Sequence, residues 1–151
     1  MDLKTILEMA IGGEPQPKGS MKAIPAKNKD GTLRIAMKND NPKTKEWQDL
    51  MSFHATSEMR GALPWEGPVV INAFFKLTRP KTHFMAKGKL RNDLVVEHID
   101  KPDLDKLIRC VLDALTGICY VDDSQVVTVS GTKSYSDFSN YPGVTLVVRG
   151  M

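Results

Sequence analysis

The pattern of hydrophobic and polar positions along the chain predicts a series of strands. Residues 5–11 form an apolar run that predicts a first strand, ended by two glycines. Residues 69–77 place apolar side chains at alternate positions, which predicts a strand with one buried face. Two further β-rich runs occupy 125–133 and 143–149, and the short apolar run 119–121 also predicts a strand.

Two segments have the apolar spacing that is typical of helices. From Thr44, the expected N-cap, apolar residues recur at helical spacing up to about Arg60. A stronger helix is predicted over 104–116, where an apolar stripe is continuous and Gly117 follows as a left-handed cap. The order of elements predicts an α/β (α+β) fold, a single mixed β-sheet flanked by two main helices. The Pro-, Gly- and Lys-rich stretch before the first helix is expected to be a long loop or a hairpin.

Length and composition limit the class of protein. The 151 residues suit a single domain spanning 1–151. The longest uncharged stretch has eleven residues, far fewer than the ~20 that span a bilayer, and the N-terminus lacks the pattern of a signal peptide. Cys110 and Cys119 have no other ligands at zinc spacing, which predicts two reduced thiols. We therefore expect a cytoplasmic protein with no membrane partner.

The formal net charge of +3 conceals an uneven distribution. Residues 15–45 carry eight basic and two acidic residues, and residues 76–91 carry six basic and none acidic. Residues 93–123 reverse the sign, with eight acidic and three basic residues. Basic segments around an acidic centre favour a polyanionic substrate handled by metal-binding carboxylates. Charged loops that are simply solvated would give the same pattern.

Acidic residues flank the start of the predicted 104–116 helix. Asp103 and Asp105 stand there, and Asp105, Arg109 and Asp113 follow the face opposite the apolar stripe. Ordinary structural roles would account for all of them. Asp103 would be an N-cap, Asp105 a first-turn acid favoured by the helix dipole, and Arg109 with Asp113 an i,i+4 ion pair.

A second acidic group, Asp122 and Asp123, follows the helix. Adjacent aspartates are poor strand formers, so this pair needs a turn or a ligand. If the chain after the helix folds back beside the helix start, the two acidic groups would meet. Three carboxylates brought together in this way would hold Mg²⁺ through oxygen ligands.

Three stretches carry a more specific signal. Residues 101–109 read Lys-Pro-Asp-Leu-Asp-Lys-Leu-Ile-Arg, residues 112–117 Leu-Asp-Ala-Leu-Thr-Gly, and residues 121–127 Val-Asp-Asp-Ser-Gln-Val-Val. In this order and spacing they closely resemble the signature of the RusA family of Holliday-junction resolvases. Looser resemblance extends to Gly13-x-Pro15-x-Pro17-Lys18, to the helix around Trp47, to the strand near residue 70 and to Lys133.

The resemblance implies a RusA-like fold and a homodimeric, Mg²⁺-dependent endonuclease. Such an enzyme cuts four-way DNA junctions by paired symmetric nicks in recombination and repair, and family analogy favours a phage setting. Carried over position by position, Asp103, Asp105 and Asp123 fall on the metal-binding aspartates, and Asp122 falls on a neighbouring, less essential acid. The basic segments would contact DNA phosphates. The expected contacts are Lys18, Lys22, Lys27, Arg79, Lys81 and Lys87.

Two positions depart from the family pattern. The catalytic lysine of the family falls on Arg109, which keeps a permanent charge but has too high a pKa to donate a proton. The asparagine after the second aspartate is Lys106 here. Lys106 would supply the ammonium from a shifted position, or it would be a solvated first-turn cation.

Two rival functions remain open from the sequence. A nucleotidyltransferase would use Asp-x-Asp with a third carboxylate, but its Gly-Ser element should precede Asp103 closely. Gly19-Ser20 lies more than eighty residues upstream. The other rival is a non-catalytic branched-DNA-binding protein with the same fold, in which the change to Arg109 has abolished turnover.

Overall fold

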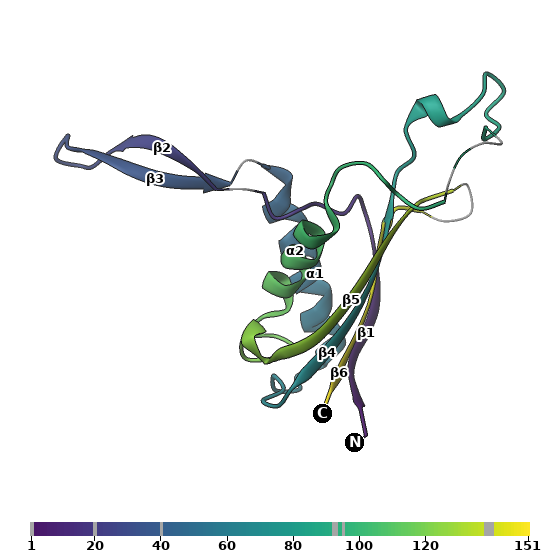
Figure 1. Cartoon of the computed structure of the whole chain (residues 1–151). Coiled ribbons are helices and arrows are strands. Elements are labelled where there is room, and N and C mark those ends of the chain that lie inside the picture. The colour runs from purple at the N-terminus through teal and green to yellow at the C-terminus, as the bar shows by residue number, and fades with distance from the viewer. Residues whose placement is uncertain (1, 20, 40, 92–93, 95, 138–140) are drawn as a thin grey trace.

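Alternating apolar residues build a central sheet whose buried face carries both helices (Figure 1). The computed structural model describes every residue except 1, 20, 40, 92, 93, 95 and 138–140. Its elements, in chain order, are β1 (Lys4–Gly12), β2 (Met21–Lys27), β3 (Leu33–Asn39), α1 (Lys43–Met59), β4 (Val69–Leu77), the 3₁₀ turn η1 (Lys81–His83), α2 (Leu104–Leu115), the 3₁₀ turn η2 (Asp123–Gln125), β5 (Val126–Tyr135) and β6 (Gly143–Gly150).

The four-stranded sheet has the order β1-β6-β4-β5. β4 pairs parallel with β5 and antiparallel with β6, so the sheet is mixed, as predicted. The alternation predicted for 69–77 is confirmed, because every second residue of β4 is buried. These residues are Val69, Ile71, Ala73, Phe75 and Leu77.

The N-cap of helix α1 lies two residues earlier than expected. Its N-cap position is Pro42, and the Asn41 side chain accepts a hydrogen bond from the Lys43 backbone N–H at 3.0 Å. The prediction of Thr44 as N-cap is therefore wrong. Thr44 is buried inside the first turn, and its hydroxyl donates to the Pro17 carbonyl at 2.7 Å, which joins the helix to the chain before β2.

Helix α2 lies close against β5 because a glycine faces it. A Cβ built on Gly131 would lie 2.8 Å from the Ile108 Cδ1 and 3.3 Å from a Leu104 methyl carbon. The helix ends as predicted, with Gly117 at a φ of +80°. The strand predicted at 119–121 is not formed, because Tyr120 makes only isolated bridges and is buried as a core side chain.

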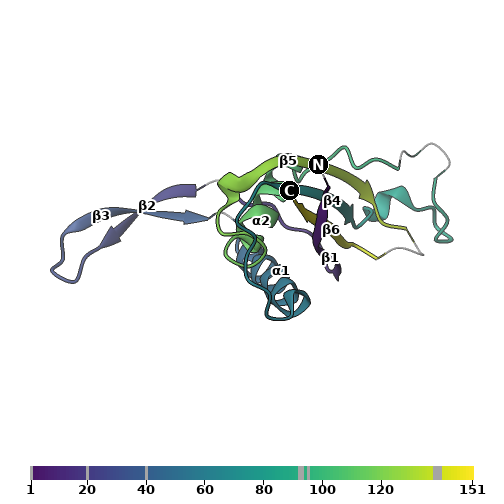
Figure 2. The same cartoon turned by 90° about the horizontal axis from the view of Figure 1, so that it is seen from below.

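The stretch between β1 and α1 forms a hairpin, one of the two predicted alternatives. β2 and β3 pair antiparallel and project from the body in both views (Figures 1 and 2). Residues that face each other across an antiparallel pair share a face, and both faces of the hairpin are mixed. One face carries Ala23, Pro25, Leu33, Ile35 and Met37 together with Lys27, and the other carries Lys22, Arg34 and Lys38 together with Ile24, Ala26 and Ala36.

The two cysteines are buried and unpaired, as the sequence predicted. Burial disfavours the thiolate, which raises the pKa of Cys110 to about 11 and that of Cys119 to about 12. Within the described residues, no helix is long and apolar enough to cross a membrane.

Candidate active site at the start of helix α2

The segment that leads into α2 is held along the end of β5. The Tyr135 N–H donates to the Val96 carbonyl at 2.9 Å, and the His98 N–H donates to the Lys133 carbonyl at 3.2 Å. An isolated antiparallel bridge between Glu97 and Ser134 lies between these bonds. The chain then passes through residues 99–102 and enters α2 at Asp103.

Asp103 occupies the N-cap position of α2, but its side chain makes no capping hydrogen bond. Instead, its carboxylate accepts a hydrogen bond from the Lys101 ammonium at 2.6 Å and lies 3.5 Å from the Lys106 ammonium. The bond from Lys101 is the main reason that the pKa of Asp103 lies below its ordinary value. Asp103 is therefore an ionised carboxylate with free lone pairs at neutral pH.

Asp105 stands one residue into the same helix, with its side chain 78% exposed. The Lys106 ammonium lies 3.8 Å from its carboxylate as well as 3.5 Å from that of Asp103. One cation thus faces two carboxylates, which are the oxygen ligands that Mg²⁺ prefers. Asp103 and Asp105 fit a divalent cation, and Lys106 occupies the neighbouring position.

Asp122 and Asp123 form a carboxyl pair at the turn after α2. Asp122 caps η2, because its side chain accepts a hydrogen bond from the Ser124 N–H and the Gln125 side chain accepts one from the Asp122 N–H. The hydrogen bond between the two carboxyls lowers the pKa of Asp122 and raises that of Asp123. The positive charge of Arg109 acts against the rise at Asp123. Arg109 itself lies midway along α2.

The two acidic groups lie at opposite ends of β4. Val126, three residues after Asp123, pairs with Val69 at the start of the strand. Asp103 lines a pocket with Leu77 at its end. Nine residues of strand separate these ends by about 26 Å.

The chain returns toward the start of α2 only along β5. Asp122 and Asp123 come before β5, so they stay at the far end of the sheet. Among the described residues, no three His, Cys, Asp or Glu side chains come close enough to hold a metal ion. The condition under which one chain would gather three carboxylates at the helix start is not met. The roles of Asp103, Asp105, Asp122 and Asp123 as metal ligands stay predictions.

The ion pair expected between Arg109 and Asp113 has a different form. Asp113 pairs with Lys18 at 3.1 Å, and the Lys18 ammonium also donates to the Gln48 side chain at 3.3 Å. Lys18, one of the predicted DNA contacts, thereby ties the chain before β2 to both helices.

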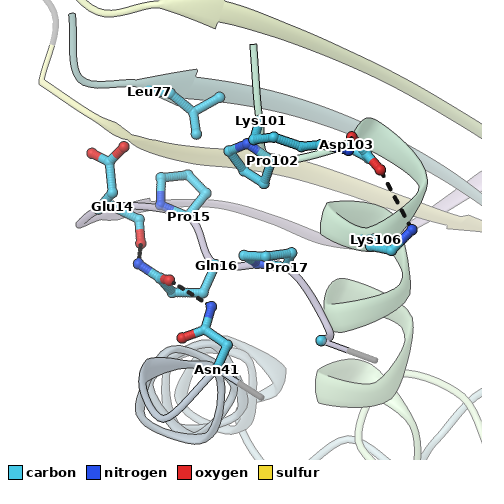
Figure 3. Close-up of a pocket in the computed structure, with 11 residues that line it drawn as sticks. Glu14, Pro15, Gln16, Pro17, Asn41, Leu77, Lys101, Pro102, Asp103 and Lys106 are labelled. Atoms are coloured by element: carbon cyan, nitrogen blue, oxygen red, sulfur yellow. Dashed lines mark hydrogen bonds and ion pairs between the residues drawn. The ribbon is translucent and has the colours of Figure 1, made fainter. Parts of the chain in front are cut away.

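A pocket of about 480 Å³ adjoins Asp103 (Figure 3). Prolines form much of its wall, and Lys101 and Lys106 reach it from the α2 side. On the other side, the Glu14 carboxylate accepts hydrogen bonds from the Thr78 N–H at 3.1 Å and the Thr78 hydroxyl at 2.6 Å. Glu14 is a site residue that the sequence did not predict. The only signal for it was its place inside the motif of alternating prolines at 13–18.

The other predicted DNA contacts stand on two projections. Lys22 and Lys27 lie on the β2–β3 hairpin, and Lys81 and Lys87 lie on the loop after β4. The hairpin and this loop extend on opposite sides of the body, with the start of α2 between them (Figures 1 and 2). Arg79 differs from these lysines, because its guanidinium lies 4.9 Å from the centre of the Tyr135 ring and is partly buried.

Comparison with known proteins agrees with the motifs on these elements. A Bacillus subtilis (strain 168) protein described as "Uncharacterized protein YqaN" is 27% identical over 151 residues, which cover 95% of each chain. A sequence model of the RusA family, described as "Endodeoxyribonuclease RusA", matches residues 13–149. This match begins directly after β1 and includes the hairpin, both helices, β4, β5 and all but the last residue of β6. The chain therefore belongs to the RusA family of endodeoxyribonucleases.

Proposed function

We propose that this protein is a Mg²⁺-dependent, structure-selective endonuclease that resolves four-way DNA junctions by paired nicks. The observation that supports this most directly is the pair Asp103 and Asp105 at the start of α2, in a chain of the RusA family. The carboxylates of both residues lie near one positive charge, the Lys106 ammonium, at 3.5 and 3.8 Å. A metal centre for phosphodiester hydrolysis needs such donors on a rigid element.

Each residue of the site has a proposed task. Asp103 and Asp105 would hold Mg²⁺, which polarises a phosphate oxygen and lowers the pKa of a bound water. Arg109 would bring a permanent positive charge to the scissile phosphate, since guanidinium pairs well with phosphate oxygens. Lys106, beside both carboxylates, would exchange its contact with them for a contact with the phosphate when the cation binds.

We further propose that the working form is a homodimer. Asp123 is too far along the sheet to join Asp103 of its own chain, so a third carboxylate would come from Asp123 of the partner subunit. A two-fold axis makes such an exchange reciprocal and creates two identical sites. Two symmetric sites suit a substrate that must be cut in two strands.

The two basic projections would bind the arms of the junction. The four lysines on these projections are exposed, and the projections themselves lie on either side of the start of α2. Phosphate contacts of this kind give binding that depends on shape and weakens steeply with salt. Lys22, Lys27, Lys81 and Lys87 are the proposed contacts, whereas Lys18 and Arg79 would act mainly within the protein.

A cleavage assay tests the activity. The protein is incubated with an end-labelled synthetic four-way junction in Mg²⁺ or in EDTA, beside the variant Asp105→Asn and a linear duplex of the same arm sequence. Symmetric nicks that need Mg²⁺, occur on the junction alone and vanish in the variant support the proposal. Tight binding to the junction without nicks would favour the non-catalytic alternative, and equal binding to junction and duplex would contradict both.

A mixing experiment tests the shared site. Asp103→Asn and Asp123→Asn are each expected to be inactive, but a mixed dimer keeps one complete site. Co-refolding the two variants should restore about a quarter of the wild-type sites, seen as single rather than paired nicks. If the mixture stays as inactive as its components, the third carboxylate does not come from the partner subunit.

A further inference from the structure

We propose that Lys133 is a positioning residue that fixes the loop carrying Asp103, and that metal binding depends on it. This inference rests on the proposed function for its effect on catalysis. The contacts that carry it come from β5, the strand that returns beside the start of α2. None of the residues assigned above as a metal ligand or DNA contact belongs to β5.

The Lys133 ammonium bonds to two carbonyls of the loop. It donates to the Asp100 carbonyl at 2.6 Å and to the Pro102 carbonyl at 2.8 Å. The Pro102 carbonyl belongs to the peptide group that precedes Asp103, so any shift of it moves the Asp103 backbone. The Lys133 backbone carbonyl also accepts the hydrogen bond from the His98 N–H. One residue of the sheet therefore holds the loop at three points.

Tyr135, two residues further on the same strand, adds a fourth point. Its hydroxyl donates to the Asp100 carboxylate at 2.8 Å. The Tyr135 ring is buried, with the His98 ring centre 4.6 Å from its own and the Arg79 guanidinium on it at 4.9 Å. The Asp100 carboxylate of the loop is thus bonded to the Tyr135 side chain, which is itself held in place by packing.

Other contacts at the helix start are weaker candidates for this task. The Asp103 side chain makes no capping hydrogen bond that would fix its own backbone. The Lys101 side chain pairs with Asp103 but is 84% exposed, and exposed pairs stabilise a geometry little. A charged donor that is partly buried and bonds to two carbonyls stabilises much more. Because catalytic groups tolerate little displacement, the rigidity of this loop bears directly on the Asp103 carboxylate.

The test compares Lys133→Met, Lys133→Arg and a matched control, Lys76→Met. Lys76 lies on the neighbouring strand β4, opposite Ser134. The substitution Lys76→Met therefore removes a lysine from the same sheet but leaves the hydrogen bonds to the loop in place. Amide hydrogen exchange of residues 97–106 measures the loop directly, without relying on cleavage. Mn²⁺ binding by calorimetry measures the metal site, and thermal unfolding reports the whole fold.

The expected result is specific to Lys133→Met. Its loop amides should exchange about ten-fold faster or more, and Mn²⁺ affinity should fall by about ten-fold. Amides in the second half of α2 and junction affinity in EDTA should stay at wild-type values, as should every measurement on Lys76→Met. Lys133→Arg should recover most of the effect, since guanidinium can donate to both carbonyls.

Contrary results are equally clear. Wild-type exchange and wild-type Mn²⁺ affinity in Lys133→Met would overturn the proposal. If Lys133→Met unfolds, Tyr135→Phe replaces it, since that variant removes only the side-chain hydrogen bond to Asp100. It should raise loop exchange and lower Mn²⁺ affinity by a smaller factor. Wild-type values of both in Tyr135→Phe would overturn the proposal too. A wild-type protein that binds Mn²⁺ but does not nick junctions would refute the proposed function, while the exchange and binding measurements would still decide the role of Lys133.

Discussion

Replacing Lys106 by asparagine tests whether its ammonium competes with the metal. Lys106 lies 3.5 Å from one carboxylate and 3.8 Å from the other, at Asp103 and Asp105, so it shares the charge that a bound cation would use. Asparagine is the residue of the family pattern at this position and removes the charge. We expect Lys106→Asn to need less Mg²⁺ for half-maximal nicking.

The size of this effect follows from exposure. The Lys106 side chain is 40% exposed and that of Asp105 is 78% exposed, so water screens both pairs. Each screened pair changes an equilibrium constant by about 1.4- to five-fold, and because the two effects multiply, together they predict a decrease of about two- to 25-fold. The effect should shrink as ionic strength rises, because salt screens exposed charges.

The assay is a Mg²⁺ titration of initial nicking rates on a four-way junction at two salt concentrations. Lys101→Asn is the control, because it removes a cation that pairs with Asp103 but not with Asp105. The Lys101 side chain is also 84% exposed, so water screens its charge more strongly. A different outcome would refute the reasoning: if Lys106→Asn lost the maximal rate while its Mg²⁺ requirement stayed the same, Lys106 would supply its ammonium to the reaction. Lys106→Ala with intact cleavage would exclude that second role.

Three further predictions concern the fold. Cys110 and Cys119 should not react with Ellman's reagent in the native protein and both should react in guanidinium, because burial raises the pKa of each thiol; rapid native reaction would contradict this. Gly150→Ala should lower the free energy of unfolding by about 1–3 kcal/mol in a denaturant titration, because the added Cβ would lie 2.7 Å from the Trp65 indole nitrogen. Gly12→Ala is the control and should leave the free energy of unfolding unchanged, because nothing lies within 4 Å of its added Cβ. Burial lowers the pKa of His98, so the unfolded chain binds the proton more readily; stability should be full above pH ~6.5 and fall as the pH drops below it, and His98→Gln should flatten that pH profile.

Elements with a buried face could be predicted from the sequence. The alternation in β4 and the stripe in α2 exist because each element has one face in the core, and both were placed within a residue or two. The hairpin could be anticipated only as an alternative, because neither β2 nor β3 buries a face against the body, and large apolar residues alternate with basic or small ones only over the short run 33–38. The run 119–121 is apolar because Cys119 and Tyr120 are buried in the core, where Tyr120 makes an isolated bridge with Trp65. A short apolar run of this kind looks the same in sequence as a buried strand.

The candidate site could be predicted in its residues but only partly in its geometry. Asp103 and Asp105 both lie at the start of α2, because Asp103 is its N-cap and Asp105 belongs to its first turn. It does not show where the chain after the helix turns back, which depends on the register of β5 against β4. The return brings Lys133 to the start of α2 and leaves Asp123 at the other end. Glu14 was missed for a similar reason, since its partner Thr78 lies 64 residues away.

The β2–β3 hairpin packs chiefly against itself and projects from the body. Its residues therefore contribute little to the core, and the free energy of folding sets few limits on which residues stand there. Substitutions and insertions at its tip, around Gly31, can accumulate while the sheet and helices are conserved by their packing. If the hairpin binds DNA as proposed, its sequence can change the nucleic-acid shapes that are bound without a cost to the core.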